Sequence, residues 1–522
     1  MQTMTFRRAA ARVLPLLMLA SLTALAQDAS QVLRTSVSFR TLKNSVKLDE
    51  EQRLRVEALE AKAREATAAG RHGDALRHYS HAMAILRNQP WTPARALGAA
   101  LQIKPDRVVV DPGDRVELRL TQIFALEEPL AGKLAGSLAL VPLKDGRPDA
   151  SATATELRSV EGIDPDFAAR PSVAATIPDL ADGPYQLSLT LRPAGGEPVV
   201  KTTSLLITRK ARAESAALKA RAAVVAAELQ KKDRQTLLRE IPAVEYRATL
   251  VSLADAGQIA VERLDLRGEL AMAASVLEGL AKGDDPLRAM RGDVRWAYRS
   301  EVDGELQPYR FYVPTKYDPA KKYPLVVALH GMGGDENSYF TFYDNGVIKR
   351  EAEARGYLVA CPKGRGPASM YLGSAERDVL DVIAAMKRDY SVDPDRVYLT
   401  GHSMGGYGTW LLAANNPEIF AALAPVAGGA MPPVMLKLGL IAHIPQYVVH
   451  GDADPTVPVE ESRKVVRAVE KLGGKVKYVE VPGGNHVDIV VPAIKDTFDW
   501  FDAHRRQPKG AAKAAGGNSQ ER

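Results

Sequence analysis

The stretch that decides the fold of this chain is Arg-Val-Tyr-Leu-Thr-Gly-His-Ser-Met-Gly-Gly-Tyr-Gly-Thr-Trp, residues 396–410. Residues 397–400 are β-branched, aromatic and aliphatic, which is typical of a buried parallel strand. The chain then turns through Gly401-His402-Ser403-Met404-Gly405 and continues as an apolar helix. Gly-x-Ser-x-Gly between a strand and a helix predicts a nucleophile elbow that projects the Ser403 hydroxyl above a sheet. The N–H of Met404, at the start of the helix, is then a candidate oxyanion donor.

Strands and helices alternate on both sides of this turn, between residues 296 and 505. Strands are expected at 296–301, 309–313, 325–329, 358–361, 397–400, 422–425, 446–449 and 475–481. Helices are expected at 347–355, 375–390, 404–415, 460–472 and 489–503. This alternation predicts an α/β fold with a doubly wound, mostly parallel sheet covered on both faces. Reactive loops are expected at the carboxyl ends of its strands, where the elbow lies.

Two acidic residues and a histidine follow later strands, where they could serve as the acid and the base that activate Ser403. Asp454 is the expected acid, because its loop resembles a His-Gly-x-x-Asp-x-x-Val-Pro form in which the later aspartate faces the histidine. Asp452 is the alternative, and its structural role would be to cap the turn. His486 follows Pro-Gly-Gly-Asn after the last strand, and the glycines allow the loop to place it over Ser403. Ser, then Asp, then His is the chain order of an α/β-hydrolase.

A glycine-rich run after the strand at 325–329, Leu-His-Gly-Met-Gly-Gly, offers a second oxyanion donor, the N–H of Met332. It occupies the position of the lipase-type glycine loop, and its alternative role is a turn that binds nothing. His504 is expected at the surface. Three other histidines near strand ends are expected to hydrogen-bond loops: His330, His402 and His450. The chain holds neither His-Glu-x-x-His nor a cysteine pair, so no metal and no other cofactor is predicted.

Three runs of this region resemble a known family. They are Leu329-His330-Gly331, the run Asp393 to Gly406, and Pro417-Glu418-Ile419-Phe420-Ala421. These motifs resemble secreted esterases grouped with feruloyl esterases and polyhydroxybutyrate depolymerases, and are similar to the catalytic domain of prolyl oligopeptidase-like enzymes. The resemblance covers about residues 295–505, and it implies the α/β-hydrolase fold and a Ser-His-Asp triad that forms an acyl-enzyme.

Three functions stay open. A carboxylic ester hydrolase of feruloyl, carbohydrate-ester or polyester type is favoured, with a small-molecule or polymer-linked ester as its substrate. A prolyl oligopeptidase-like serine peptidase is the second, although no blade-length repeat of an N-terminal propeller is visible. The third is a catalytically idle envelope binding or scaffold protein, which the intact candidate triad and glycine loop disfavour. The connection between the strands at 422–425 and 446–449 is too short for a large lid, which suits bulky or polymeric acyl substrates.

The first 26 residues predict a signal peptide. Three arginines precede an apolar run at 13–25, and Ala24-Leu25-Ala26 is a small-x-small cleavage site. The apolar run is shorter than the roughly 20 residues that span a bilayer, so no membrane span is expected after removal of the signal. The sole cysteine, Cys361, excludes an internal disulfide. Export by the general route to the periplasm or medium is therefore predicted.

The whole chain of 522 residues is long enough for several domains. The expected parts are a signal peptide (1–26), a tetratricopeptide-like helical hairpin region (27–97), an immunoglobulin-like β-sandwich (98–208), a helical linker region interrupted at Pro242 (209–290), the α/β-hydrolase domain (291–505) and a disordered tail (506–522). Sandwich strands are expected at 107–110, 115–120, 137–141, 185–191 and 202–208. The helical and sandwich regions are expected to serve as spacers or protein contacts. The formal net charge of +6 is concentrated in the two ends of the chain, so no nucleic-acid partner is predicted.

Overall fold

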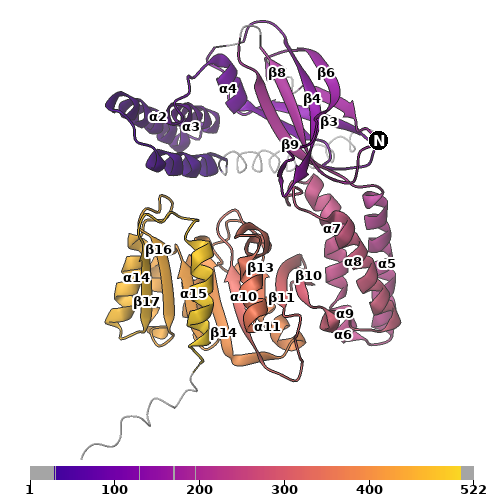
Figure 1. Ribbon diagram of the computed structural model, residues 1–522, viewed down its shortest axis with the longest axis vertical. Helices are drawn as coiled ribbons and strands as arrows, with labels where there is room; N and C mark the ends of the chain where they lie inside the picture. Colours follow the sequence, from indigo (N-terminus) through magenta and orange to yellow (C-terminus); the bar gives the residue numbers. More distant parts are fainter. Residues whose placement is uncertain (1–28, 30, 129, 168–170, 194–195, 507–522) are drawn as a thin grey trace, which may run out of the picture. The chain divides into compact units, whose positions relative to one another are not determined.

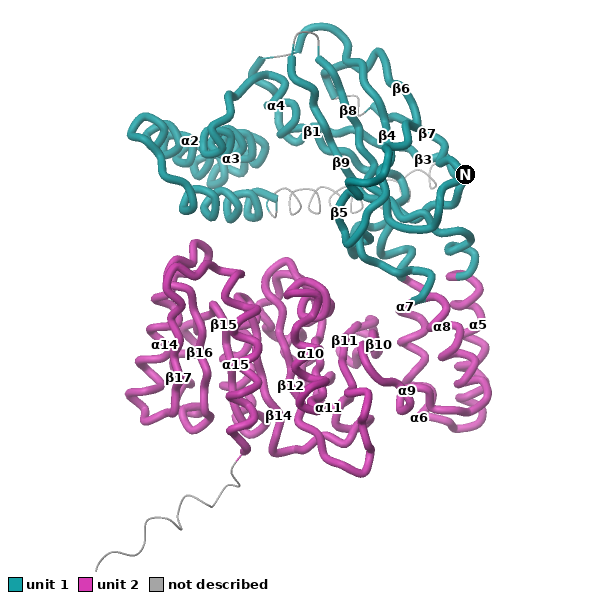
Figure 2. The backbone as a smooth tube through the Cα atoms, in the orientation of Figure 1, with its two compact units in different colours: residues 1–214, 250–269 teal, residues 215–249, 270–522 magenta. Residues whose placement is uncertain are grey.

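The computed structural model describes residue 29 and residues 31–128, 130–167, 171–193 and 196–506. The predicted signal peptide (1–26) and all but the first residue of the predicted tail (506–522) lie outside the described residues. The chain forms two compact units, residues 1–214 with 250–269 and residues 215–249 with 270–522 (Figure 2). The predicted helical linker region therefore contributes to both units.

The second unit is built around an eight-stranded sheet (Figure 1). Its strands are β10 (Gly292–Arg299), β11 (Leu306–Val313), β12 (Tyr323–Leu329), β13 (Leu358–Pro362), β14 (Val392–His402), β15 (Ala422–Val426), β16 (Gln446–Gly451) and β17 (Val476–Val481). They are ordered β10-β11-β13-β12-β14-β15-β16-β17. β11 is antiparallel to both of its neighbours, and every pairing from β13 to β17 is parallel. The sheet confirms the predicted α/β-hydrolase fold, with each of the eight expected strands present.

Helices cover both faces of this sheet. Helices α10 (Val347–Arg355) and α15 (Val490–Asp502) share one core with the side chains of Val326 and Ala328 on β12. Successive side chains of a strand point to opposite faces, and Leu329 accordingly lies against Gly408 of α12 (Met404–Asn415) on the other side. Other elements of the unit are α6 (Gln235–Leu238), α9 (Pro286–Ala289), the π-helix η2 (Ser338–Phe342), α11 (Ser374–Asp389), α13 (Pro432–Met435), η3 (Leu438–Leu440) and α14 (Glu460–Lys471).

The first unit begins with helices that pack around their own apolar core. After a helix over residues 31–45 come α2 (Glu50–Ala68), α3 (His72–Leu86) and α4 (Pro93–Ala100). Asp49 starts α2 with a capping box, because its carboxylate accepts the N–H of Gln52 at 2.8 Å. α2 and α3 are the two helices that the sequence predicts on either side of residues 70–74.

Two sheets follow and enclose a single core. The three-stranded sheet is ordered β1 (Leu101–Pro105), β3 (Arg115–Gln122) and β7 (Ser172–Thr176). The other sheet holds β2 (Val109–Val110), β9 (Val199–Ile207), β8 (Gly183–Arg192), β4 (Leu134–Lys144) and β5 (Arg147–Pro148) in that order, with β6 (Thr155–Ile163) paired to β4. The five strands predicted for this segment are present, and β1, β5, β6 and β7 are additional.

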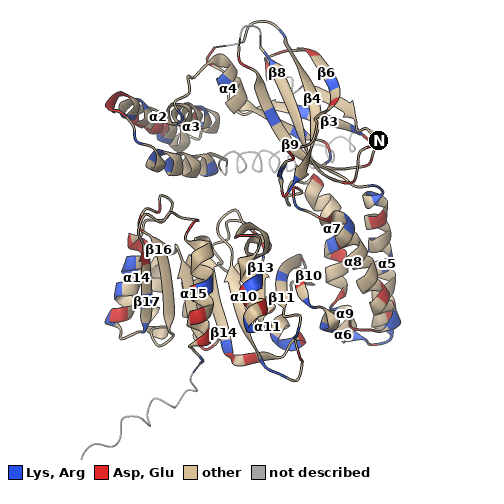
Figure 3. Cartoon of the chain, viewed as in Figure 1, with Lys and Arg blue, Asp and Glu red and all other residues tan. Residues whose placement is uncertain are grey.

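Three long helices connect these sheets to the hydrolase domain: α5 (Ala211–Lys231), α7 (Ile241–Asp255) and α8 (Leu266–Lys282). Pro242, the predicted interruption, lies in the first turn of α7, where its missing N–H removes no helical hydrogen bond. Cationic and anionic residues are interspersed along α5, α8 and α14 (Figure 3). Across the described ranges, none of the helices combines the length and the apolar composition that crossing a bilayer needs.

Candidate active site

Ser403 lies between β14 and α12 in a backbone conformation that L-residues rarely adopt, with φ 59° and ψ −117°. Glycines on both sides allow this turn. A Cβ atom at Gly401 would lie 2.2 Å from the carbonyl oxygen of Gly405, and one at Gly405 would lie 2.0 Å from that of Leu329. Such backbone strain persists only where the surrounding structure enforces it, and it is concentrated at functional sites.

His486 lies in the loop between β17 and α15, and its two ring nitrogens face different side chains. Nε2 lies 2.8 Å from Oγ of Ser403. Nδ1 lies 2.6 Å from Oδ2 of Asp454, in the turn after β16. When Nδ1–H donates to the carboxylate, Nε2 is left to accept the serine proton. The structure thus brings the three residues predicted as a triad into one hydrogen-bonded chain.

Asp454 and Asp452, the two candidate acids, have different partners. Oδ1 of Asp454 accepts the N–H groups of Thr456 at 2.8 Å and Val457 at 2.9 Å, while its Oδ2 faces His486. Asp452 instead accepts the N–H of Gly483 at 2.7 Å. Burial of Asp454 opposes its ionisation, but hydrogen bonds from the neighbouring histidines and Val457 outweigh this effect and hold its pKa well below the usual range.

Two backbone segments next to Ser403 can supply oxyanion donors. Met404 is the first residue of α12, so its N–H has no partner within the helix. The glycine loop lies against the serine, since a Cβ atom at Gly331 would be 3.4 Å from the Cβ of Ser403. Met332 follows in this loop and lines the same cavity as Ser403. Both predicted donors therefore lie beside the candidate nucleophile.

A cavity of about 390 Å³ opens at Ser403. It is lined by residues 331–335 of the glycine loop, by Ser338, Thr341, Phe342 and Tyr343 around η2, and by His402, Ser403, His486 and Val487. Three apolar side chains in this lining are unusually exposed: Phe342 at 65%, Met332 at 55% and Val487 at 42%. They give the entrance of the cavity an apolar rim.

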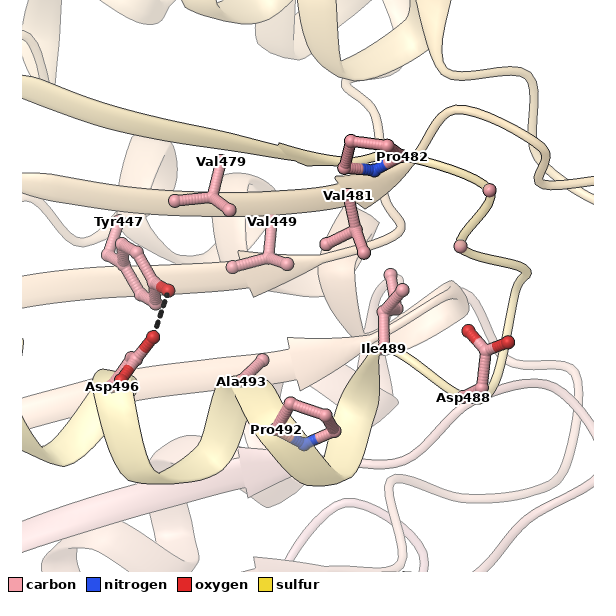
Figure 4. Close-up of a pocket in the computed structure, with 12 residues that line it drawn as sticks. Tyr447, Val449, Val479, Val481, Pro482, Asp488, Ile489, Pro492, Ala493 and Asp496 are labelled. Atoms are coloured by element: carbon pink, nitrogen blue, oxygen red, sulfur yellow. Dashed lines mark hydrogen bonds between the residues drawn. The ribbon is translucent and has the colours of Figure 1, made fainter.

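A second hollow, of about 310 Å³, lies between β16, β17 and the start of α15 (Figure 4). Val449, Val481 and Ile489 face it, and the Tyr447 hydroxyl donates to Oδ2 of Asp496 across one end at 3.3 Å. Its lining contains none of the predicted triad or oxyanion residues. This hollow is therefore separate from the candidate site.

One histidine and one tyrosine have positions that the sequence does not predict. His504 is buried, not at the surface, because Lys475 lies 2.9 Å from its Nε2 and its ring packs on Trp500 at 4.1 Å. Tyr343 is the missed residue, and its hydroxyl lies 2.8 Å from Nδ1 of His402. In the sequence it belongs to an aromatic run that is indistinguishable from ordinary core. Within the part of the chain that the structure describes, no group of three or more His, Cys, Asp or Glu residues could hold a metal ion.

The sequence model of the Esterase family matches residues 303–436. Poly(3-hydroxyalkanoate) depolymerase C of Paucimonas lemoignei is 33% identical over 138 residues, which are 24% of this chain and 32% of that protein. Feruloyl esterase B of Talaromyces funiculosus is 29% identical over 176 residues, covering 28% and 48%. Dipeptidyl-peptidase 5 of Porphyromonas gingivalis is 29% identical over 155 residues, covering 28% and 22%.

The chain spans about a fifth to a half of the length of these curated relatives. They are the kinds of enzyme that the motifs around Ser403 resemble, and that resemblance is confirmed. Together with the order and direction of the eight strands, these findings identify the C-terminal part of this chain as an α/β-hydrolase domain related to esterases.

Proposed function

We propose that this chain is an exported serine hydrolase that cleaves carboxylic esters. The observation that carries the proposal is the chain of hydrogen bonds from Ser403 through His486 to Asp454, at 2.8 and 2.6 Å. It starts from a serine held at φ 59° and ends at a carboxylate that is fully buried. Nucleophile, base and base-orienting acid are then within reach of one another, as covalent catalysis requires.

The proposed reaction proceeds through an acyl-enzyme. His486 Nε2 takes the hydroxyl proton as Oγ of Ser403 attacks the ester carbonyl carbon, and Asp454 stabilises the imidazolium that forms. The N–H groups of Met404 and Met332 bind the oxyanion. Collapse of this intermediate breaks the bond to the alkoxy oxygen, and the alcohol leaves with the proton from His486. Water then attacks the acyl-enzyme with His486 again as the base, releasing the acid and restoring Ser403.

Feruloyl, carbohydrate-ester or polyester substrates fit the site best. The exposed Phe342, Met332 and Val487 at the cavity entrance can cover the apolar surface of an acyl group. The connection between β15 and β16 carries only the short α13 and η3, which leaves no inserted lid domain there. Similarity to a feruloyl esterase and to a polyester depolymerase supports the same substrate classes.

A serine peptidase acting on short peptides is the second candidate. The similarity to dipeptidyl-peptidase 5 favours it, because amide and ester hydrolysis use the same triad and oxyanion site. The two candidates differ in the leaving group, an amine in one and an alcohol in the other.

Hydrolysis of a substrate panel by wild type and Ser403→Ala tests both candidates. The panel should contain p-nitrophenyl and feruloyl esters beside aminoacyl-prolyl amides. We expect the esters to be cleaved by wild type alone, with a loss of at least about 10⁴-fold in kcat for the alanine variant. Cleavage of the amides alone would replace the esterase by the peptidase. If the two proteins showed equal rates on every compound, the remaining hypothesis would be a catalytically idle binding or scaffold protein.

A further inference from the structure

Two buried histidines outside the triad contact the residues that form it. His402 directly precedes Ser403 and is 5% exposed, and His450, in β16, is 0% exposed. Both lie at strand ends where the sequence predicts loop hydrogen bonds. In the structure the loops that they bind are those that carry His486 and Asp454.

His402 holds the main chain of His486. Its Nε2 lies 2.6 Å from the His486 carbonyl oxygen, while the Tyr343 hydroxyl donates to its Nδ1 at 2.8 Å. Burial, with a further contribution from the charge of His486, lowers the pKa of His402 to about 3, so the ring is neutral. With Nδ1 accepting from Tyr343, the single ring proton is on Nε2 and is donated to the carbonyl. The rings of His402 and His486 are also packed at 4.7 Å.

His450 holds the carboxylate of Asp454. Its Nε2 faces two acceptors, the carbonyl oxygen of Val457 at 3.0 Å and Oδ2 of Asp454 at 3.3 Å, so Nε2 carries a proton. Its Nδ1 lies 2.7 Å from the hydroxyl of Ser462, which is anchored to the carbonyl oxygen of Gly428. Oδ2 of Asp454 thus lies within 3.3 Å of two imidazole nitrogens, one in the triad and one outside it. Glu480, opposite His450 on β17, is paired with Arg463.

We propose that His402 and His450 are positioning residues of the triad. His402 fixes the main chain of His486 so that Nε2 points at Ser403, and His450 fixes the plane of the Asp454 carboxylate. This rests on the proposed function, because it assigns both residues a part in triad geometry. Displacement of a reacting group by about 1 Å can lower a rate by about 10²-fold, so the effect belongs in kcat more than in KM.

Paired substitutions separate positioning from simple packing. Glutamine at either position retains an N–H near the site of Nε2, and leucine does not. We expect His402→Leu and His450→Leu to lower kcat by about 10²-fold with KM nearly unchanged, and His402→Gln and His450→Gln to recover most of that loss. Tyr343→Phe should lower kcat by a smaller factor. His443→Gln, at an exposed histidine between β15 and β16, is the unchanged control.

Two further readouts would not respond to a merely structural role. In His450→Leu, Asp454 loses one donor and attracts the proton on His486 more strongly, so the acid limb of the kcat/KM profile should move to higher pH. The low-field proton NMR signal of the His486–Asp454 bond, recorded without substrate, should shift in the same variant. Leucine variants with wild-type kcat, pH profile and NMR signal would overturn the positioning proposal. A wild type that hydrolyses no ester would instead overturn the proposed function, leaving the NMR signal to judge positioning.

A cavity in the first unit supports an independent inference. It measures about 540 Å³ and lies where β1 and β3 meet β9. The lining includes three cationic side chains, those of Lys104, Arg119 and Lys201, and no carboxylate. The other lining residues are Gln102, Ile103, Thr121 and Thr202. Among the described residues, none forms an ion pair with Lys104, Arg119 or Lys201.

Two features of this lining favour a bound anion. Lys104 and Arg119 are direct cross-strand partners, and like charges in that position repel. Burial lowers the pKa of Lys201, whose ammonium group is held by the Gly98 carbonyl oxygen at 3.0 Å. A bound anion would relieve both the repulsion and the unbalanced charge.

We propose that this cavity binds the carboxylate of an acidic sugar. The three cationic side chains are opposite in charge to the carboxylate. The hydroxyl and amide groups of Thr121, Thr202 and Gln102 can hydrogen-bond to sugar hydroxyls. The volume is suited to more than a single small ion, which favours a uronic acid in an oligosaccharide over free phosphate. Recognition by charge also needs no aromatic stacking platform, and none of the residues that line the cavity is aromatic.

Calorimetric titration of the full chain with an oligogalacturonate tests this site. We expect Lys104→Gln combined with Arg119→Gln to weaken binding by about tenfold or more, and to raise the melting temperature because the repulsion is gone. Arg115→Gln, an exposed position on β3 outside the cavity, is the matched control and should change neither. Equal binding of inorganic phosphate or of a neutral xylo-oligosaccharide would overturn the acidic-sugar assignment. No binding, or an equal loss in the control, would overturn the site.

Discussion

Asp452 and Asp454 are two positions apart in one acidic turn, and they bind different partners. Some of these contacts can be predicted from the sequence and others cannot. The loop pattern favours Asp454 as the acid, and in the structure Asp454 is the aspartate that lies 2.6 Å from His486. It could not show that His450 lies 3.3 Å from the same carboxylate oxygen, because that contact depends on how the turn folds back over the strand end. The contact between Tyr343 and His402 could not be predicted either, because nothing in a buried aromatic run shows which polar group a tyrosine hydroxyl will bind.

Replacing each aspartate by asparagine is expected to separate the two roles. Asp454→Asn should lower kcat by roughly 10³–10⁴-fold, because the amide no longer fixes the imidazole tautomer that accepts the serine proton. Asp452→Asn retains an acceptor for the Gly483 N–H and should keep at least about a tenth of the activity. Steady-state ester hydrolysis measures both. A larger loss in Asp452→Asn than in Asp454→Asn would reverse the assignment.

Among the elements, strands buried on both faces were the easiest to predict. Four strands are short, largely apolar runs between turn residues, which is the pattern expected of a strand buried on both faces. They are β12, β13, β15 and β16. Of the four sandwich strands that the sequence does not predict, two have a clear physical reason. β6 exposes most of its residues, and β7 is only five residues long and consists of small or β-branched residues, so neither sequence alternates clearly between large apolar and polar side chains.

The junction of α7 with β10 holds a titratable group that the sequence does not reveal. Glu240, one residue before α7, is 1% exposed, and its Oε2 accepts Nε1–H of Trp296 at 2.9 Å. Burial, and then the negative charge of Asp389, raise the pKa of Glu240 to about 7 from its ordinary 4.5. The folded protein therefore keeps a proton that the unfolded chain releases within this range. Stability is expected to fall as the pH rises from 4.5 to about 7.

Glu240→Gln should remove this pH dependence, since glutamine retains an acceptor for Trp296 without a charge. The stability of the variant relative to wild type is expected to grow by roughly 2 kcal/mol between about pH 5 and pH 8, given about 1.4 kcal/mol per pKa unit. Urea unfolding at the two pH values measures it. Glu470→Gln, an exposed residue of α14, controls for the loss of one charge. A difference that shrinks toward high pH would contradict the assignment of Glu240.

At the scale of the whole molecule, the chain divides into two compact units. The second unit contains the candidate triad and oxyanion loops, and the first contains helices α2 to α4 and the two upstream sheets. The hydrolase fold could be predicted because recognisable motifs follow β12, β14, β16 and β17 in the chain order typical of that fold. The arrangement of the upstream sheets could not, because some of their pairings join strands far apart in the sequence, such as β3 with β7 and β2 with β9.

Export is the prediction that concerns the molecule as a cellular protein. We expect the mature chain to begin at Gln27, because Ala24-Leu25-Ala26 satisfies the small-residue requirement of signal cleavage. N-terminal sequencing of protein from the periplasmic fraction of a bacterial host measures this. Ala26→Tyr should leave the precursor uncleaved. Mature protein that retains Met1 in that fraction would contradict the predicted signal.

Ser403 as the nucleophile is the point on which the proposed function depends, and covalent labelling tests it most directly. Reaction with a fluorophosphonate, followed by peptide mass spectrometry, should place one adduct on Ser403, and ester hydrolysis should decline in step with labelling. His486→Ala should slow labelling strongly, because the serine then has no base to take its proton. An adduct on a different residue, or full ester hydrolysis with Ser403 completely labelled, would contradict the proposed function.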